Sequence, residues 1–423
     1  MSRTLISGVR PVYPDGVGPI GWVVVCDGVF EAIGTGDCPR GSFDNVIDGC
    51  GAWMMPGLID THVHFREPGM TEKATVASES AAALRGGVTT VFDMPNTKPP
   101  TTTASAFLKK VALYERECLT DFKIFLGAAP GIMQELPQIA SHPRFAGVKL
   151  FWGATTGSTG MPAQAELDEL FDFCARHGII IMVHAEDNDI IAANTAEAIA
   201  RYGSKEAVPV EEHSSIRSSE ACLSASRQAV ELAVKHRTRL HLAHLTTAAE
   251  VELMKSAPDF ITCETTPLYT STTLADPANF STRLKVNPAV KGVADAAALQ
   301  EGLRTDVIDT LGTDHAPHLP ADKQGGALTA ASGAPWIQFA LPILLETFSP
   351  ELIARKMAQA PARLFGMERV GEIKPGYRAD FSLVVPVEIW IVTDADVVSK
   401  CGWTPAAGLT LHHRVLLTSR VKR

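Results

Sequence analysis

The middle of the chain alternates short apolar runs with helical stretches, and this pattern most constrains the fold. The run TTVFDM (89–94) is followed by a helical stretch at 104–119 and then by DFKIFLGA (121–128), and the same order returns at 146–187. Such alternation builds a parallel sheet covered by helices on both faces. About eight strand candidates lie between residues 55 and 320. We therefore predict an α/β fold with a (β/α)8 TIM-like barrel; an open doubly wound sheet is the alternative.

Both chain ends have a different rhythm. The runs TLISG and WVVVCDGVFEAIG near the start are β-rich and separated by Pro, Gly and Asp. The runs ADFSLVVP, EIWIVTDADVV and LHHRVLLTS near the end read the same way. We predict that residues 1–54 and 366–423 pair into a small flanking β-sandwich, and that residues 55–365 form the barrel.

Composition narrows the function classes. Hydrophobic residues make up 46% of the 423 residues, which excludes a disordered chain. The net charge of −9 argues against nucleic acid or an anionic membrane as the partner, but it leaves room for a small anionic substrate. The eight scattered cysteines form no C-x-x-C pair, and no apolar stretch of about 18 residues exists. We expect a cytoplasmic enzyme.

The sequence Asp60-Thr61-His62-Val63-His64-Phe65-Arg66 is the most specific local motif. Side chains at i and i+2 of a strand point the same way, so two imidazoles share one face. That spacing suits a shared metal ion, and the pair follows an apolar strand, where barrel active sites lie. The alternative is a pair of ordinary polar residues at a strand end.

Other potential ligands end other strand candidates. His184 ends IIIMVHAED, and Asp314 ends DVIDTLGTD. His241 and His244 compete in LHLAHLTT; they face opposite sides of a strand, and His244 lies nearer its carboxyl end. We choose His244 as the ligand and expect His241 to pack behind it.

Lys149 lies inside the apolar run GVKLFWG, where a buried cation is costly. An ion-paired lysine is the ordinary interpretation. The alternative that we favour is a neutral amine that reacts with carbon dioxide. The resulting carbamate is anionic and has two oxygens, so it can bridge two metal ions, which an ammonium cannot do.

In this order along the chain, several motifs resemble those of the dihydroorotase family, in the amidohydrolase superfamily. They run from about residue 55 to 410: PGLIDTHVHFREPG, FDMPNTKPPTTT, GVKLF, VHAED, LAHLTT, KVNPAV, GTDHAPH and SKCGWTP. The tail GEIKPGYRADFSLV resembles the family's closing β segment. FREPG together with MPNT favours dihydroorotase over hydantoinase and allantoinase, which share the ligand set.

The resemblance implies a site with two divalent metal ions, most simply zinc. Its ligands would be His62, His64, Lys149, His184, His244 and Asp314. Lys149 would be N6-carboxylated and would bridge the ions together with a hydroxide. The implied reaction is the reversible ring closure of N-carbamoyl-L-aspartate to (S)-dihydroorotate in pyrimidine synthesis, with Asp314 as both ligand and general acid/base.

The resemblance also implies substrate contacts. Arg66 can hold the substrate carboxylate in two parallel bonds, and the amide of Asn96 can hold the same group. Asn287 can meet the amide edge of the ring. The full set of expected substrate contacts is His64, Arg66, Asn96, Asn287, His318, Ser332 and Gly333. Alone, each would be read as a surface or capping residue.

One departure from the family pattern concerns CETTPLYTST, where relatives carry Pro-His-His and this chain has Leu268 and Tyr269. The change leaves the ligand set intact but bears on the loop over the site.

Two other functions remain open: a hydantoinase- or allantoinase-like cyclic amidase, and an inactive scaffold. The expected partners are the small-molecule substrate, a second copy in a homodimer, and an aspartate transcarbamoylase.

Overall fold

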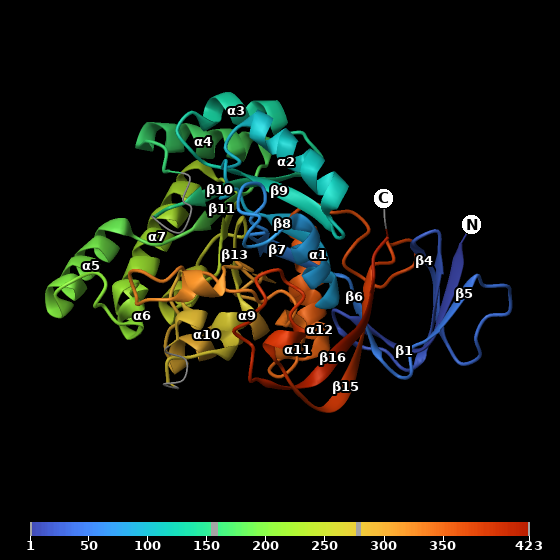
Figure 1. The fold of residues 1–423 in the computed structure, drawn as a ribbon. Helices are drawn as coiled ribbons and strands as arrows, with labels where there is room; N and C mark the ends of the chain where they lie inside the picture. The colour runs from blue at the N-terminus through green and yellow to red at the C-terminus, as the bar shows by residue number, and fades with distance from the viewer. Residues whose placement is uncertain (1, 154–159, 276–280, 422–423) are drawn as a thin grey trace.

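The computed structural model describes residues 2–153, 160–275 and 281–421, and within them two sheets organise the chain (Figure 1). One is a parallel sheet of eight strands in the order in which they occur in the sequence. Its strands are β7 (Leu58–Val63), β8 (Val88–Asp93), β9 (Asp121–Gly127), β10 (Phe145–Phe151), β11 (Ile181–His184), β12 (Leu240–Leu242), β13 (Ile261–Thr265) and β14 (Thr310–Leu311).

The first and last strands of this sheet meet, which nearly closes the barrel. A parallel bridge joins Val63 to His315, just beyond β14, and the His64 amide donates to the His315 carbonyl at 2.8 Å. The predicted (β/α)8 barrel is confirmed, and the open sheet is excluded. Strand β14 is shorter than the run DVIDTLGTD suggested, because the chain turns into the site directly after Leu311.

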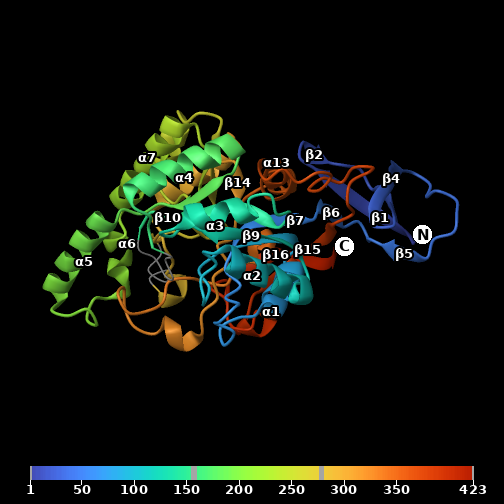
Figure 2. The same ribbon diagram turned by 90° about the horizontal axis from the view of Figure 1, so that it is seen from above.

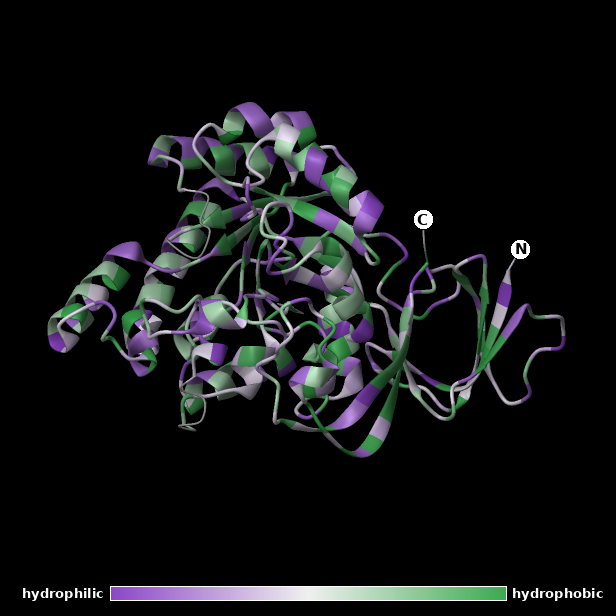
Figure 3. Cartoon of the chain, in the orientation of Figure 1, coloured by the Kyte–Doolittle hydropathy of each residue, from purple (hydrophilic) through white to green (hydrophobic). Residues whose placement is uncertain are grey.

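Helices cover the outside of the barrel (Figure 2). The main ones are α1 (Val76–Arg85), α2 (Ala104–Glu117), α3 (Ile132–Ile139), α4 (Gln164–His177), α5 (Asn188–Tyr202), α7 (Ser219–His236), α8 (Ala248–Met254) and α10 (Val293–Arg304). Side-chain oxygens of Thr75, Thr103, Asp187 and Ser218 accept first-turn amides and so fix where four of them begin. Helices α2 and α4 carry mixed hydrophilic and hydrophobic residues (Figure 3), as expected for helices with one buried face.

Shorter helices complete this part of the chain. They are α6 (His213–Ile216), α9 (Pro267–Ser271), α11 (Ala340–Leu344), α12 (Pro350–Ala354) and α13 (Ala360–Leu364). Beyond α13, the Phe365 ring packs against Phe92 and Phe125 from the barrel strands, at centroid distances of 4.7 and 6.1 Å. The amino-terminal end of the barrel is therefore packed with aromatic side chains, which leaves the carboxyl end for the site.

Both chain ends build the flanking sheet, and Figure 1 shows the two termini on this side of the molecule. Its strands are β1 (Arg3–Tyr13), β2 (Gly16–Val17), β3 (Gly21–Cys26), β4 (Val29–Thr35), β5 (Asn45–Asp48), β6 (Trp53–Pro56), β15 (Phe381–Ile391) and β16 (Thr410–Ser419). The first part of β1 pairs with β3 and β5, and its later residues pair with β6. Apolar side chains of both strand groups share one core, which includes Ile6, Phe30, Met54 and Phe381.

The run MMPGLIDTHVHF at residues 54–65 takes part in two strands. Strand β6 pairs with β1 and β15 in the flanking sheet, and β7 begins the barrel. Gly57 separates them, and a Cβ there would lie 2.4 Å from Thr89 Oγ1. The predicted division between residues 54 and 55 therefore falls inside β6.

None of the helices in the described part of the chain combines the length and apolar character that a membrane crossing needs.

Candidate active site

The carboxyl ends of the barrel strands surround one pocket of about 390 Å³. Every residue that the sequence nominated for the site lines it, except His318. Phe151 and Ala316, which the sequence did not nominate, line it as well. The nominated residues on its wall are His62, His64, Arg66, Asn96, Lys149, His184, His244, Asn287, Asp314, Ser332 and Gly333.

One group of donor atoms comes from β7 and the end of β14. Asp314 Oδ1 lies 3.0 Å from His64 Nε2 and 3.5 Å from His62 Nε2, and the three ligand atoms lie within 4.8 Å of one another. The backbone of Asp314 and of His244 adopts a positive φ, 49° and 42° respectively, and these conformations set the direction of the two side chains. Such backbone conformations are costly for residues other than glycine, and they concentrate at functional sites.

Hydrogen bonds on the far side of each ring direct the imidazole lone pairs into the pocket. His62 Nδ1 lies 2.5 Å from Glu264 Oε1, and His64 Nδ1 lies 2.6 Å from Asn96 Oδ1. Both partners are acceptors, so each Nδ1 carries the hydrogen and each Nε2 presents a lone pair. Metal-binding histidines are commonly oriented by acceptors in this way.

A second pair of donors comes from β11 and β12. His184 Nε2 lies 2.9 Å from the Glu186 carboxylate, so its Nδ1 is left to face His244 Nε2 at 2.8 Å. His244 Nδ1 is buried and, among the residues that the structure describes, has no hydrogen-bond partner. A cation between the two rings would accept both inward lone pairs and leave the His244 hydrogen on Nδ1, so the donor set fits a metal ion.

Burial keeps these imidazoles neutral. Burial and the nearby Lys149 cation lower the pKa of His62 to about 4, and burial lowers the pKa of His184 and His244 as well. Burial opposes ionisation of Asp314, but the surrounding imidazoles, His62 first, hold its pKa well below the usual range. At neutral pH the pocket therefore offers neutral nitrogen ligands and an ionised carboxylate, as divalent cations require.

Lys149 lies between the two donor groups on β10. Its side chain is buried, and its Nζ is 3.3 Å from His62 Nε2. Burial lowers its pKa to about 8, so about one amine in ten is neutral at pH 7. A neutral amine is the form that reacts with carbon dioxide, so this position fits a bridging carbamate.

Arg66 follows the two histidines and adopts a positive φ of 66°. Its Nε donates to the Pro317 carbonyl at 2.9 Å, which fixes the guanidinium on the pocket wall. His318 lies behind it, with Nε2 3.0 Å from Arg66 Nη2, and Lys73 Nζ lies 3.2 Å from the other His318 nitrogen. This end of the pocket is rich in cations although the whole chain is acidic.

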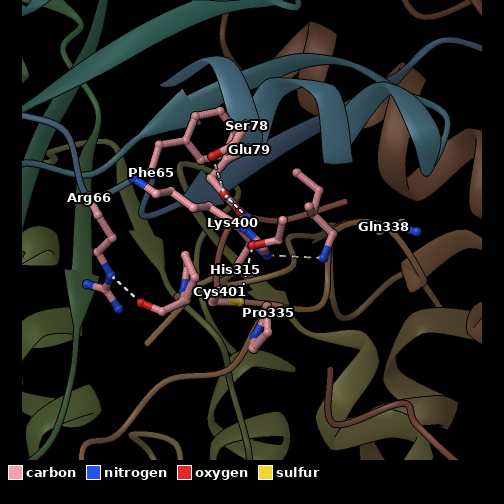
Figure 4. A network of polar contacts seen from close by, with 12 residues as sticks. Phe65, Arg66, Ser78, Glu79, His315, Pro335, Gln338, Lys400 and Cys401 are labelled. Atoms are coloured by element: carbon pink, nitrogen blue, oxygen red, sulfur yellow. Dashed lines mark hydrogen bonds and ion pairs between the residues drawn. The ribbon is translucent and has the colours of Figure 1, made fainter. Parts of the chain in front are cut away.

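A buried network outside the pocket supports the same strands (Figure 4). The Glu79 carboxylate on α1 lies 2.7 Å from His315 Nε2 and accepts the backbone amide of Lys400 at 3.2 Å. On its other side, His315 Nδ1 accepts the amide of Trp336 at 3.1 Å. Helix α1, the barrel seam and the carboxyl-terminal segment are therefore joined next to Asp314.

Sequence reasoning missed the acidic partners Glu79, Glu186 and Glu264. A signal for one of them was present, since Glu264 stands inside the apolar run DFITCETT, where an unpaired carboxylate would be costly. His241 packs behind the site, as expected: its Nδ1 bonds Thr262 Oγ1 at 2.8 Å, and it lies 3.5 Å from Glu264. Leu268 and Tyr269 are buried on α9, and the Tyr269 hydroxyl donates to the Pro288 carbonyl at 2.5 Å.

With this geometry in place, the comparisons with known proteins assign the family. The sequence profile of the Amidohydrolase family matches residues 53–403, so the chain belongs to that family. Within it, the chain is 35% identical to a dihydroorotase of Halobacterium salinarum, over 84% of this chain and 82% of that protein. It is 30% identical to a dihydroorotase of Methanosarcina acetivorans, over 96% of this chain and 88% of that protein.

Other cyclic amidases are similar too. An allantoinase of Rubrobacter xylanophilus is 31% identical over 94% of this chain and 88% of that protein. Among solved structures, an L-hydantoinase from Arthrobacter aurescens matches with a TM-score of 0.93 and 28% identity, covering 100% of this chain and 96% of that chain. The fold and site thus define an enzyme that hydrolyses cyclic amides, and choosing among substrates requires the chemistry of the pocket.

Proposed function

We propose that this enzyme is a dihydroorotase, which closes N-carbamoyl-L-aspartate to dihydroorotate and reopens the ring. The observation that carries the proposal is Arg66, whose guanidinium lines the same pocket as the metal-ligand candidates. Dihydroorotate carries a carboxylate beside its ring nitrogen, and a planar guanidinium binds a carboxylate through two parallel bonds. Asn96, on the same wall, contributes an amide next to His64.

The donor set suits two divalent cations, and its imidazole and carboxylate ligands favour zinc. His62, His64 and Asp314 would hold one ion, His184 and His244 the other, and an N6-carboxylated Lys149 would lie between them. When bound, the ions supply an activated water at neutral pH and polarise the scissile carbonyl. Support for this arrangement comes from the inward lone pairs, the partnerless His244 Nδ1 and the buried lysine described above.

The chain's own residues then position the substrate and move one proton. Arg66 would hold the α-carboxylate and Asn287 the amide edge of the ring. During ring closure the carbamoyl nitrogen forms a bond to the β-carboxyl carbon, and Asp314 accepts the nitrogen's proton and passes it to the oxygen that leaves that carbon; with one further proton from solvent, this oxygen departs as water. Its low pKa keeps Asp314 ionised and ready for this step. In hydrolysis Asp314 returns the proton to the ring nitrogen.

A hydantoinase or allantoinase activity is the second candidate, and the similarity to the L-hydantoinase and the allantoinase favours it. Hydantoin and allantoin lack the ring carboxylate, so they bring no anion to the Arg66 guanidinium. Arg66 is only 4% exposed, so an anionic substrate group that neutralises its charge is favoured over a neutral one. The charge of the pocket therefore favours dihydroorotate.

The proposed setting is a reducing compartment, the cytoplasm, and all eight cysteines are free, which suits it. The homodimer and the association with an aspartate transcarbamoylase stay predictions from the sequence.

Ring closure by the purified chain tests the proposal. The chain, supplied with zinc, is incubated with N-carbamoyl-L-aspartate, and dihydroorotate is followed by its absorbance. We expect zinc-dependent formation of dihydroorotate that stops when a chelator is added. A zinc-loaded chain that forms no dihydroorotate would contradict the assignment and would favour the inactive scaffold or another cyclic amide.

A further inference from the structure

Residues 330–333 form part of the pocket wall but belong to no helix or strand. Their backbone carbonyls need partners from elsewhere, because an unpaired buried carbonyl costs free energy. Three side chains supply them: Lys285, His318 and Lys323 each place a nitrogen against one or two of the four carbonyls. This part of the wall is therefore held by side chains rather than by a sheet.

Lys323 makes the largest share of these contacts. Its Nζ lies 2.8 Å from the Ala331 carbonyl and 2.9 Å from the carbonyls of both Gly333 and Lys285. An ammonium has three hydrogens, so it can donate one to each oxygen. Burial and the cations Lys285 and Arg66 lower the pKa of Lys323 to about 6, whereas the three carbonyl dipoles favour the charged form. Even the neutral amine donates two of the three bonds.

The three carbonyls belong to two separate segments that reach the pocket. Lys285 begins the segment that leads to Asn287, and residues 331–333 carry the backbone of Ser332. The Gly333 amide donates back to the Lys285 carbonyl at 2.9 Å, so the two segments are joined at this point. Within the described residues, the Ser332 amide donates to no protein acceptor, and Ser332 lines the pocket.

The other side of residues 330–333 has no room to adjust. Gly333 has a φ of +135°, which favours glycine, and a Cβ there would lie 2.8 Å from the Ala316 carbonyl. Residues 330–333 therefore pack against Ala316 on one side and are hydrogen-bonded to Lys323 on the other.

We propose that Lys323 is a positioning residue that fastens residues 330–333 to the segment of Asn287 and so sets the width of the ring-binding wall. The proposal rests on the proposed function for the identity of the ring. Lys323 touches neither the reacting atoms nor any metal-ligand candidate, so its effect should fall on binding of the ring.

Replacement of Lys323 by methionine tests this role, because methionine keeps the length and the apolar stem but donates no hydrogen bond. We expect KM for dihydroorotate to rise by about 10- to 100-fold, because the two or three hydrogen bonds that hold this wall are lost together, while kcat changes less than about threefold. Bound zinc per chain should stay at the wild-type level. A fall of kcat and zinc together, with KM unchanged, would show a merely structural role and overturn the proposal.

Two further variants complete the design. Lys356→Met removes another buried lysine, which lies away from the pocket and donates to the Ile308 carbonyl at 2.5 Å. This variant should leave KM unchanged. Lys323→Gln keeps two donors and should give a KM between those of the wild type and Lys323→Met; a KM equal to that of the wild type would count against the tie. If Lys323→Met fails to fold, the comparison of KM between the wild type and Lys323→Gln decides alone.

The same measurements separate this proposal from the proposed function. If the wild type opens hydantoin but not dihydroorotate, the function fails, and the KM comparison is repeated with hydantoin. A KM shift with hydantoin would then support the tie, and an unchanged KM would overturn it as well.

Discussion

At the scale of single residues, the site depends on how the far side of each ligand candidate is held. The rings of His62, His64 and His184 each direct one nitrogen inward because an acceptor takes the hydrogen of the other. Lys149 differs from these histidines, because an ammonium has no lone pair to offer a cation. Its buried amine must change chemically before it can act as a ligand, which makes it the most informative single position.

We expect Lys149→Ala to lose zinc and to lower kcat/KM by about 10²- to 10⁴-fold, because the bridge between the cations is gone. Added short carboxylic acids such as acetate or propionate should restore part of the activity by entering the space and supplying the two oxygens. The measurements are zinc per chain and the rate with and without the acid.

Lys110→Met is the matched control for this rescue. Lys110 is also buried and lies beside a barrel strand, but it pairs with Asp93 and donates to the Met94 carbonyl at 2.8 Å. The Lys110→Met variant should have a lower free energy of unfolding, and its activity should not respond to carboxylic acids. Full activity of Lys149→Ala without any added acid would contradict the bridging role.

At the scale of elements, the barrel strands could be predicted because each is a short apolar run beside a helical stretch. Strand-end residues such as His184 and Asp314 could be nominated, since parallel strands present their carboxyl ends on one face. The split of 54–65 into β6 and β7 could not, because both halves begin with apolar residues and only the pairing of β6 with β1 and β15 separates them. Partners such as Glu264 also escaped, because they depend on contacts between strands that are distant in sequence.

Strand β13 contributes Glu264 to the site from outside the pocket. Its carboxylate touches His62 Nδ1 and accepts the Thr61 hydroxyl at 3.0 Å. We expect Glu264→Gln to weaken zinc binding by about 10- to 100-fold, the range for partners that orient a ligand. Zinc titration of the metal-free chain measures this effect.

The control for Glu264 is Glu250→Gln. Glu250 is a buried glutamate on α8 that bonds Ser226 at 2.8 Å and Thr247 at 2.9 Å, away from the pocket. Zinc affinity should be unchanged in this variant. Equal losses in both variants would mean that Glu264 acts through stability alone.

At the scale of the whole molecule, an ion-pair network joins the lower end of the barrel to the flanking sheet. Arg378, just before β15, lies 2.5 Å from both Asp121 on β9 and Asp380, and Arg144 lies 2.6 Å from Asp121. Burial opposes ionisation of Asp121, but Arg378 and then Arg144 lower its pKa to about 2. Because the folded pKa lies below the ordinary value, Asp121 stabilises the fold above about pH 4 and this contribution fades toward pH 2.

We expect Arg378→Met to cost about 3–5 kcal/mol of unfolding free energy at pH 7, because it leaves the buried Asp380 without its cation and Asp121 with Arg144 alone. The difference from the wild type should shrink as the pH falls toward 3, where those carboxylates take up protons. Calorimetry of the metal-free chains at both pH values measures it. A difference that does not change with pH would contradict the electrostatic origin.

The control for this network is an exposed ion pair in the last turn of α2, formed by Arg116 and Glu117. Arg116→Met should change the unfolding free energy by less than about 0.5 kcal/mol at either pH, as is usual for surface ion pairs.

The measurement that bears most directly on the function is a comparison of three rings with two chains. Wild type and Arg66→Met, both zinc-loaded, are assayed for kcat/KM with dihydroorotate, hydantoin and allantoin. We predict that the wild type prefers dihydroorotate and that Arg66→Met loses about 100-fold or more with that substrate alone, because only dihydroorotate presents a carboxylate to the guanidinium. A wild type that prefers hydantoin or allantoin, or an Arg66→Met chain that opens dihydroorotate at the wild-type rate, would contradict the assignment.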